Sequence, residues 1–293
     1  MNRKNWLWWR NNPINLQQTR QHLREKLNHF GCDTPGNTSL ILLQHALNQP
    51  KSWILSHGEY QLNPQEDNTL QISLNAYLQG VPLPYVLGYW DFYGRTFQLT
   101  PDVMIPRPET ELLVEKAIQH ARSLQKPRII DVGTGSGAIA VSLAAELPKA
   151  VVMGVDLSMA ALRVAQVNAQ RLCASKICFI QADLLTTFSG CFDLVCANLP
   201  YLPRQTLSTL SVSKWEPLLA LDGGETGLDA IQKLLRQAQT RLSPLGMVLI
   251  ETDASLGAET LAAAQAAFPK AQHQLISDLT GRDRIVAIQR NKN

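Results

Sequence analysis

Strand-like and helix-like segments alternate along this chain from residue 128 to its end. Short apolar runs rich in β-branched residues are separated by longer segments whose apolar residues recur at helical spacing. Such an alternation specifies a mainly parallel sheet covered by helices on both faces. We therefore predict an α/β fold with a Rossmann-like sheet of seven strands, in which ligands bind at the carboxyl ends of the strands.

The expected elements of this region follow from the pattern of apolar residues. Strands are expected at residues 128–132, 151–155, 176–180, 192–197, 247–251, 272–277 and 284–289. Helices are expected at residues 110–123, 137–146, 158–172, 229–242 and 256–267. The last two strands would close the sheet as a hairpin.

The chain before residue 106 has a different character. Residues 1–80 carry leucines at helical spacing and predict a small helical bundle that binds a partner or positions a substrate. Residues 81–105 contain prolines and glycines and predict a linker with a β-hairpin, formed by residues 92–98 and 103–105. Residues 106–293 form the Rossmann-like domain. Three N-terminal tryptophans form either an exposed anchor or part of the bundle's packing: Trp6, Trp8 and Trp9.

Composition excludes several classes of protein. No apolar run approaches the roughly 18 residues that a membrane span requires. The first ten residues lack the apolar core of a signal peptide, so we expect a cytoplasmic protein without a membrane partner. The net charge of +3 is dispersed, without a run of lysine or arginine, and does not favour a nucleic-acid substrate. Nothing in the chain demands more than a monomer.

The cysteines and histidines do not form a recognisable metal site. The five cysteines show no C-x-x-C pair, and the six histidines are scattered away from the glycine-rich segments. Cys191 and Cys196 flank or lie within an expected buried strand, which favours buried free thiols over metal ligands. We therefore expect no metal and no histidine general base.

A glycine-rich turn follows the expected strand at 128–132. It contains Gly133, Thr134, Gly135, Ser136 and Gly137. Glycine permits a tight turn and a close approach of a ligand to the backbone, and the free amides of the following helix favour an anionic group. Asp156 ends the next strand, where an acid accepts hydrogen bonds from ribose hydroxyls. The pair indicates a nucleoside cofactor, but the glycine spacing differs from that of dinucleotide sites because Ala138 stands at the third position.

This candidate site also includes Asp183 and Leu184, which follow the strand expected at 176–180. Asp183 is placed to accept a hydrogen bond from an adenine amino group, and Leu184 to lie beside the ring. An equally good interpretation of Asp183 is a helix or turn cap.

A second motif follows the strand at 192–197, and it carries a resemblance. Asn198-Leu199-Pro200-Tyr201 is similar to the Asn-Pro-Pro-Tyr signature of methyltransferases that act on planar nitrogens. Further segments resemble the release factor glutamine methyltransferases: 105–111, 131–137, 216–217 with 220–221, 223–224 with 227–229, and 278–284. These matches run in order along residues 82–288, and the chain is identified as a member of that family.

The resemblance implies an S-adenosyl-L-methionine-dependent enzyme that methylates the side-chain amide (N5) of glutamine. Its substrate would be the Gly-Gly-Gln motif of peptide chain release factors, which makes release factors the expected partners. The glycine turn, Asp156, Asp183, Leu184 and Asn198 would hold the cofactor, while residues 198–201 would hold the glutamine.

The chemistry of an amide acceptor agrees with this assignment. The Asn198 side-chain oxygen and the Leu199 carbonyl would accept the two N–H groups of the glutamine and gain strength as positive charge grows on its nitrogen. Pro200 would stiffen the loop, and Tyr201 would pack on the acceptor side chain. The family has proline where this chain has Leu199; the proposed contact uses a backbone carbonyl, which leucine keeps.

Two further predictions concern the entrance of the site. Arg107 and Glu109 either shape the substrate entrance or form a surface salt bridge. Residues 206–225 show few secondary-structure signals and predict a binding loop or lid.

Three other functions are alternatives to glutamine methylation. An adenine-N6 methyltransferase acting on nucleic acid would present the same donor geometry, but it requires a basic groove and space for a flipped base. A non-catalytic module would not need the glycine turn, Asp156 and Asn198 together. A nicotinamide dehydrogenase would require the dinucleotide spacing.

Overall fold

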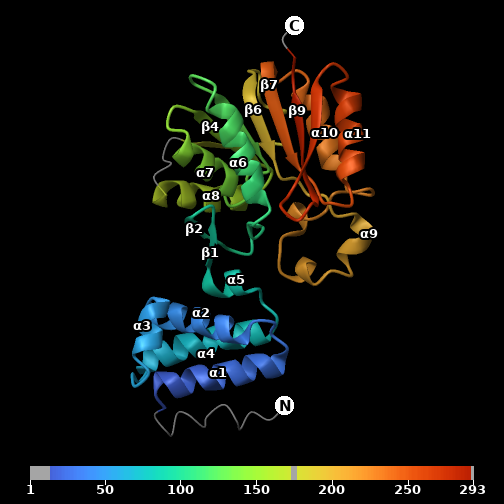
Figure 1. The fold of residues 1–293 in the computed structure, drawn as a ribbon. Coiled ribbons are helices and arrows are strands. Elements are labelled where there is room, and N and C mark those ends of the chain that lie inside the picture. The colour runs from blue at the N-terminus through green and yellow to red at the C-terminus, as the bar shows by residue number, and fades with distance from the viewer. Residues whose placement is uncertain (1–13, 173–176, 292–293) are drawn as a thin grey trace. The chain divides into compact units, whose positions relative to one another are not determined.

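The computed structural model describes residues 14–172 and 177–291, which form two compact units, 1–87 and 88–293 (Figure 1). The N-terminal tryptophans and Cys173 lie outside the described residues. Within them, none of the helices combines the length and apolar character that crossing a bilayer requires.

The first unit is helical. Its helices are α1 (Leu16–Phe30), α2 (Pro35–Leu47), α3 (Lys51–Ser56), α4 (Pro64–Leu78) and α5 (Leu83–Leu87). Capping boxes start α1 at Asn15 and α4 at Asn63, because each asparagine side chain accepts the amide three residues on. Leucines on α1, α2 and α4 supply a closed apolar core that includes Leu23, Leu42 and Leu70. The helical bundle expected for this region is confirmed.

The second unit begins with a β-hairpin, whose strands differ from those expected. β1 (Tyr89–Phe92) pairs with β2 (Arg95–Gln98), whereas residues 103–105 form no strand, so the predicted pairing of 92–98 with 103–105 is wrong. Tyr93 and Gly94 both have positive φ, as the two-residue turn that joins twisted strands requires. The turn therefore lies inside the segment that was expected to be one strand.

The main sheet has seven strands in the order β5-β4-β3-β6-β7-β9-β8. The strands are β3 (Arg128–Val132), β4 (Val151–Asp156), β5 (Cys178–Gln181), β6 (Phe192–Ala197), β7 (Leu242–Glu251), β8 (Gln272–Ser277) and β9 (Asp283–Gln289). β3 to β7 are mutually parallel, and β9 pairs antiparallel with both β7 and β8. The prediction of a seven-stranded, mainly parallel sheet closed by a hairpin is confirmed.

Helices cover both faces of this sheet (Figure 1). The long helices are α6 (Thr110–Ala121), α7 (Ala138–Glu146), α8 (Met159–Arg171), α10 (Asp229–Ala238) and α11 (Gly257–Ala267). The segment between β6 and α10 holds the short elements α9 (Arg204–Leu207), η3 (Ser211–Lys214) and η4 (Leu218–Ala220).

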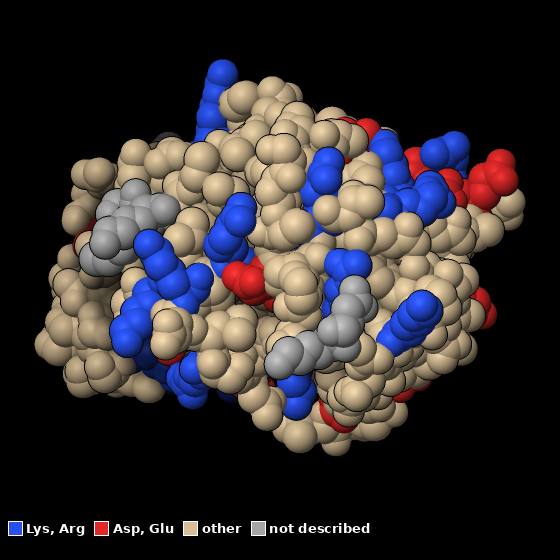
Figure 2. Space-filling model, turned by 90° about the horizontal axis from the view of Figure 1, so that it is seen from above, with Lys and Arg blue, Asp and Glu red and all other residues tan. Residues whose placement is uncertain are grey.

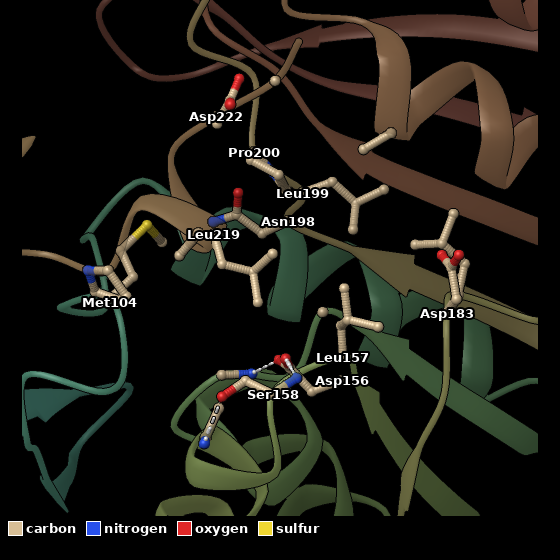
Figure 3. A pocket seen from close by; sticks show the side chains of 18 of the residues that line it. Met104, Asp156, Leu157, Ser158, Asp183, Asn198, Leu199, Pro200, Leu219 and Asp222 are labelled. Atoms are coloured by element: carbon tan, nitrogen blue, oxygen red, sulfur yellow. Dashed lines mark hydrogen bonds between the residues drawn. The ribbon is translucent and has the colours of Figure 1, made fainter. Parts of the chain in front are cut away.

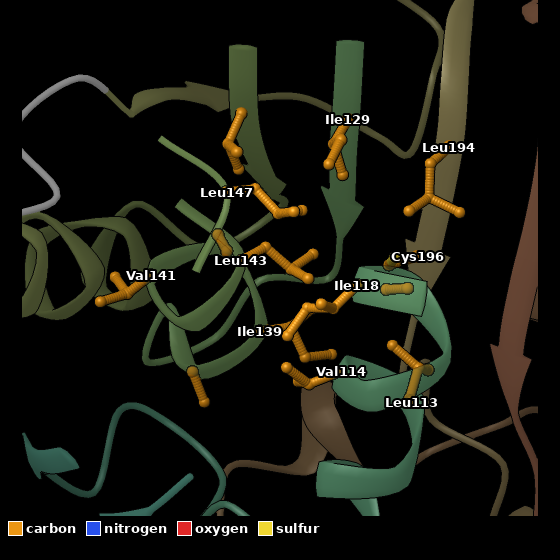
Figure 4. Close-up of a cluster of buried hydrophobic side chains, with 14 of the residues drawn as sticks. Leu113, Val114, Ile118, Ile129, Ile139, Val141, Leu143, Leu147, Leu194 and Cys196 are labelled. Atoms are coloured by element: carbon orange, nitrogen blue, oxygen red, sulfur yellow. The ribbon is translucent and has the colours of Figure 1, made fainter. Parts of the chain in front are cut away.

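Successive side chains of the central strands point to opposite faces of the sheet and pack into two separate hydrophobic cores. Ile129 and Leu194 pack with Leu113 of α6 and Leu143 of α7, as Figure 4 shows. Their neighbours Ile130 and Val195 face the other way and pack with α10 and α11. This alternation is the two-residue period of a strand that is buried on both faces. It fixes the register of the parallel strands and so aligns their carboxyl ends.

Candidate active site

A cavity of about 420 Å³ lies at the carboxyl ends of the central parallel strands (Figure 3). Its lining includes Gly133 and Gly135 after β3, Asp156 after β4, and the segment 198–200 after β6. Residues 102–104 and the segment between β6 and α10 supply further lining. In Figure 3, Asn198, Leu199 and Pro200 lie on one side of the cavity, opposite Asp156 and Ser158. The two motifs that sequence reasoning singled out therefore share one cavity.

The glycine turn leaves its backbone open to this cavity. Gly135 has a φ of +54°, and a Cβ at this position would meet no other atom within 4 Å. At Gly133, with a φ of +75°, a Cβ would lie only 3.0 Å from the Leu199 Cδ2 atom. A side chain at either position would be strained, and at Gly133 it would also push against the loop formed by residues 198–201, called the acceptor loop below.

Asp156 is held in place by the glycine turn and by the start of α8, the helix that follows it. Its carboxylate accepts the Gly135 amide and the Ser158 amide, both at 2.9 Å. Burial raises the pKa of Asp156, and these amides act in the opposite direction. Because each carboxylate oxygen accepts more than one hydrogen bond, Asp156 keeps capacity for a pair of hydroxyl donors at the cavity wall.

Three residues of the predicted cofactor turn do not line the cavity: Thr134, Ser136 and Gly137. Thr134 and Ser136 are buried, and the Thr134 hydroxyl donates to Asp131 Oδ2 at 2.6 Å. The Ser136 carbonyl accepts Asn168 Nδ2 at 2.9 Å. Asp131 is fully buried, and burial raises its pKa to about 7. These residues hold the shape of the turn, whereas Gly133 and Gly135 face the cavity.

Asp183 and Leu184 both line the cavity at the end of β5. The Asp183 carboxylate forms an ion pair with Lys233 of α10, which also lines the cavity. Asp183 therefore lies at the cavity wall, and its role at a ligand stays a prediction. Sequence reasoning missed Lys233, because nothing in the sequence says that α10 lies beside the loop after β5.

Residues 198–201, the acceptor loop, contact the rest of the protein on the side that faces away from the cavity. Asn198 Nδ2 donates to the Thr110 hydroxyl at 3.1 Å. The Leu199 side chain is buried, while Pro200 lines the cavity. Tyr201 does not line the cavity; its ring packs on the core of the α10 face. Burial raises the pKa of Tyr201 to about 12, with the charges of Glu251 and Asp253 acting in the same direction.

The segment after Tyr201 is attached to the site by its backbone and by one ion pair. The Leu202 amide donates to the Leu221 carbonyl, and the Gly223 amide donates to the Leu202 carbonyl. Arg107 forms an ion pair with Glu216, whose side chain is only 1% exposed. Glu109 faces Arg284 at 3.8 Å, so Arg107 and Glu109 pair with different segments and not with each other.

Besides Lys233, sequence reasoning missed Thr110 and Glu251. Glu251 ends β7 with 3% exposure, and burial raises its pKa to about 7. Thr110 stood inside a segment quoted for the family resemblance, but Glu251 ended an expected strand and carried no motif. The fact that β6 and β7 are neighbours would have placed Glu251 beside Asn198.

The four cysteines within the described residues are free thiols. Cys196 is buried within β6, and burial raises the pKa of its thiol well above the usual value. Cys178 and Cys191 are exposed, so the expectation of a buried thiol is wrong for Cys191, which stands just before β6. Across residues 14–172 and 177–291, histidines, cysteines and acids nowhere gather in a group that could hold a metal ion.

Comparison with known proteins gives two matches to family models. Residues 123–287 match a methyltransferase domain, and residues 18–88 match the PrmC N-terminal domain.

Curated relatives align over nearly the whole chain. The release factor glutamine methyltransferase of Moorella thermoacetica is 36% identical over 274 residues, which cover 92% of this chain and 97% of that protein. That of Deinococcus radiodurans is 35% identical over 266 residues, covering 90% and 95%.

Among solved structures, the T. thermophilus 16S rRNA N2 G1207 methyltransferase, in complex with AdoMet and guanosine, superposes with a TM-score of 0.52. The two are 21% identical, and the match covers 69% of this chain and 50% of that one. This likeness shows the methyltransferase fold.

Proposed function

Because this chain belongs to the release factor glutamine methyltransferase family, we propose that its cavity brings S-adenosyl-L-methionine against a glutamine side chain of a release factor. The chain is an S-adenosylmethionine-dependent protein-(glutamine-N5) methyltransferase. The glutamine is that of the Gly-Gly-Gln motif in peptide chain release factors. The observation that carries the proposal for the site is that Asn198 and Asp156 face one cavity.

The cavity suits the cofactor in size and in chemistry. Its volume of about 420 Å³ lies within the ordinary range of ligand sites. Asp156 would accept the ribose hydroxyls, Asp183 would accept the adenine amino group, and the open backbone at Gly135 would admit the rest of the ligand. When bound, S-adenosylmethionine supplies an electrophilic methyl group on its sulfonium sulfur.

Residues of the acceptor loop orient the glutamine. Asn198 Oδ1 and the Leu199 carbonyl accept its two N–H groups and aim the amide nitrogen into the cavity. As the N–C bond forms and the S–C bond breaks, positive charge grows on that nitrogen, and both acceptors bind it more strongly. The proton then leaves to water, so the site needs no strong base. Pro200 stiffens the loop, and Tyr201 anchors its far end in the core.

The helical unit supplies a surface for the protein substrate. It matches the PrmC N-terminal domain and carries no motif of the chemistry itself. A release factor is large compared with its methylated loop, so contacts outside the cavity add affinity and select the factor. We assign this role to residues 1–87, in a cytoplasmic enzyme that acts as a monomer.

An adenine-N6 methyltransferase on nucleic acid is less well supported. Figure 2 shows the end of the sheet opposite the cavity, where lysine and arginine side chains lie in several groups that other residues separate. The cavity wall carries more acids than cations: it holds Arg204 and Lys233, which pair with Asp222 and Asp183, and in addition Asp102, Asp156 and Asp229. A site of this charge does not attract a phosphate backbone.

The test is methyl transfer from labelled S-adenosylmethionine to purified, unmethylated release factor. A factor with Gln→Ala in its Gly-Gly-Gln motif and duplex DNA serve as comparisons. Label on the wild-type factor alone is the expected result. Label on DNA with none on the factor would overturn the glutamine assignment while leaving the cofactor site in place.

A further inference from the structure

Two buried residues, Thr110 and Glu251, lie next to Asn198 outside the cavity lining. Asn198 follows β6 and Glu251 ends β7, and these parallel strands pair Ala197 with Ile250 just before them. Thr110 begins α6, which packs on both strands. Thr110 and Glu251 are 4% and 3% exposed, and neither lines the cavity. The established activity assigns them no task.

The contacts among the three residues have a defined direction. Asn198 Nδ2 donates to Thr110 Oγ1 at 3.1 Å. Thr110 and the Asn198 side chain lie close enough to the Glu251 carboxyl to lower its pKa, as donors beside a carboxylate do, and Glu251 Oε2 is buried without a hydrogen-bond partner among the described residues. An ionised carboxylate only accepts, whereas an asparagine amide has two donors at one end and an acceptor at the other. The donor end of Asn198 is therefore the end that faces Thr110 and Glu251.

We propose that Thr110 and Glu251 form an amide lock, which holds the Asn198 side chain with its oxygen, and not its NH₂ group, toward the acceptor. The inference rests on the proposed function, in which that oxygen accepts an N–H of the glutamine. In the inverted rotamer, Asn198 would present donors to an amide that also presents donors, and it would leave its oxygen against the carboxylate. The lock thus selects acceptors that carry N–H groups and positions them for transfer.

The charge of Glu251 is part of the lock. A carboxylate enforces the direction of the hydrogen bonds, whereas a protonated carboxyl can donate and so tolerates the inverted amide. The charged and titratable groups that face Glu251 are Glu109 before α6, Arg284 of β9 and Tyr201 after β6. Burial raises the pKa of Glu251 to about 7; Glu109 raises it further and Arg284 opposes this. Turnover should therefore rise as the pH passes upward through about 7, where Glu251 loses its proton.

The test compares Glu251→Gln and Thr110→Val with the wild type at saturating release factor and saturating S-adenosylmethionine. Each variant is expected to lose kcat by about tenfold, because the direction of the Asn198 amide is no longer fixed: valine lacks the acceptor of Thr110, and glutamine can donate as well as accept. The KM for S-adenosylmethionine should not change. Glu251→Gln should also lack the rise of kcat near neutral pH, and Thr110→Ser should recover most of the turnover that Thr110→Val loses.

Controls separate the lock from the fold and from the function. Glu146→Gln makes the same chemical change at the last residue of α7, where Glu146 forms an ion pair with Arg95 of β2, and it should keep wild-type turnover. The unfolding midpoint and the cofactor Kd of each variant establish that the site is intact. If Glu251→Gln keeps both wild-type kcat and the wild-type pH profile, the lock is refuted while the proposed function stands. If the wild type itself does not label the release factor, the proposed function has failed instead.

Discussion

At the scale of single residues, we assign different roles in the cavity to Asn198 and Asp156. In the proposed function Asn198 binds the acceptor and Asp156 binds the cofactor, and the structure shows Asp156 accepting the Gly135 and Ser158 amides. The two side chains lie on opposite sides of the cavity (Figure 3). Substitutions at the two positions should therefore have different kinetic signatures.

Asn198→Ala should lower kcat strongly and leave cofactor affinity nearly unchanged. The variant loses an acceptor that binds the glutamine most tightly in the transition state, an effect of about a hundredfold or more in comparable sites. Single-turnover methylation of the release factor and calorimetric titration of S-adenosylmethionine measure the two quantities. An equal loss of turnover and of cofactor affinity would show that Asn198 does not act on the acceptor.

Asp156→Asn should show the opposite signature. Its carboxylate would be replaced by a group with one acceptor and one donor end, so the cofactor Kd should rise by about tenfold while kcat at saturation changes little. Asp193→Asn is the matched control, because Asp193 also accepts two hydrogen bonds, from the Arg128 amide and the Ser243 hydroxyl, at the other end of β6. A similar loss of cofactor affinity in both variants would contradict the assignment of Asp156 to the cofactor.

At the scale of elements, the segment between β6 and α10 depends on one ion pair with the segment before α6. Arg107 pairs with Glu216, and the residue after Glu216, Pro217, lines the cavity. Burial raises the pKa of Glu216, and the Arg107 charge opposes that effect. Removing the arginine would leave a buried carboxylate without its counter-charge, which is worse than having neither group.

Arg107→Ala should accordingly loosen this segment. We expect faster amide exchange over residues 202–222 and a higher KM for the release factor, since the loop forms part of the cavity wall. Adding Glu216→Gln to Arg107→Ala should restore part of the protection, because the second change removes the uncompensated charge. Hydrogen exchange followed by mass spectrometry reports both variants, and unchanged exchange in Arg107→Ala would show that backbone contacts alone hold the loop.

The elements were predictable where local pattern determines them. The strands at 128–132, 192–197 and 272–277 were expected with the bounds that they have, because each is an apolar or alternating run with clear ends. The first hairpin was misplaced, since Tyr93, an unusual residue at positive φ, forms half of its turn. β7 begins at Leu242, five residues before the predicted start at 247.

The site was predictable only where it is built from motifs within one segment. Gly133, Gly135, Asp156 and the 198–200 segment follow directly from strand-end positions. Thr110, Lys233 and Glu251 enter through neighbours in space, and those neighbours depend on the order of strands in the sheet, which the sequence pattern leaves open.

At the scale of the whole molecule, two buried acids contribute to how stability varies with pH. Burial raises the pKa values of both Asp131 and Glu251 to about 7, from 3.8 and 4.5 respectively. Between the unfolded and the folded pKa, the folded state holds a proton that the unfolded state has released. The contribution of these two groups to the free energy of unfolding therefore falls as the pH rises through this window, by about 1.4 kcal/mol per pH unit for each whole proton of difference. Below the unfolded pKa and above about 7, these two groups contribute no further slope.

Glu251→Gln isolates one of these contributions, because glutamine does not titrate. The difference in the free energy of unfolding between this variant and the wild type should change steadily from about pH 5 to about pH 7 in favour of the variant, then level off. Denaturant titrations of both proteins at a series of pH values measure it. A constant difference across that range would mean that Glu251 is ionised throughout. The amide lock would then be closed at every pH tested, and the rise of turnover expected near neutral pH would have to be absent as well.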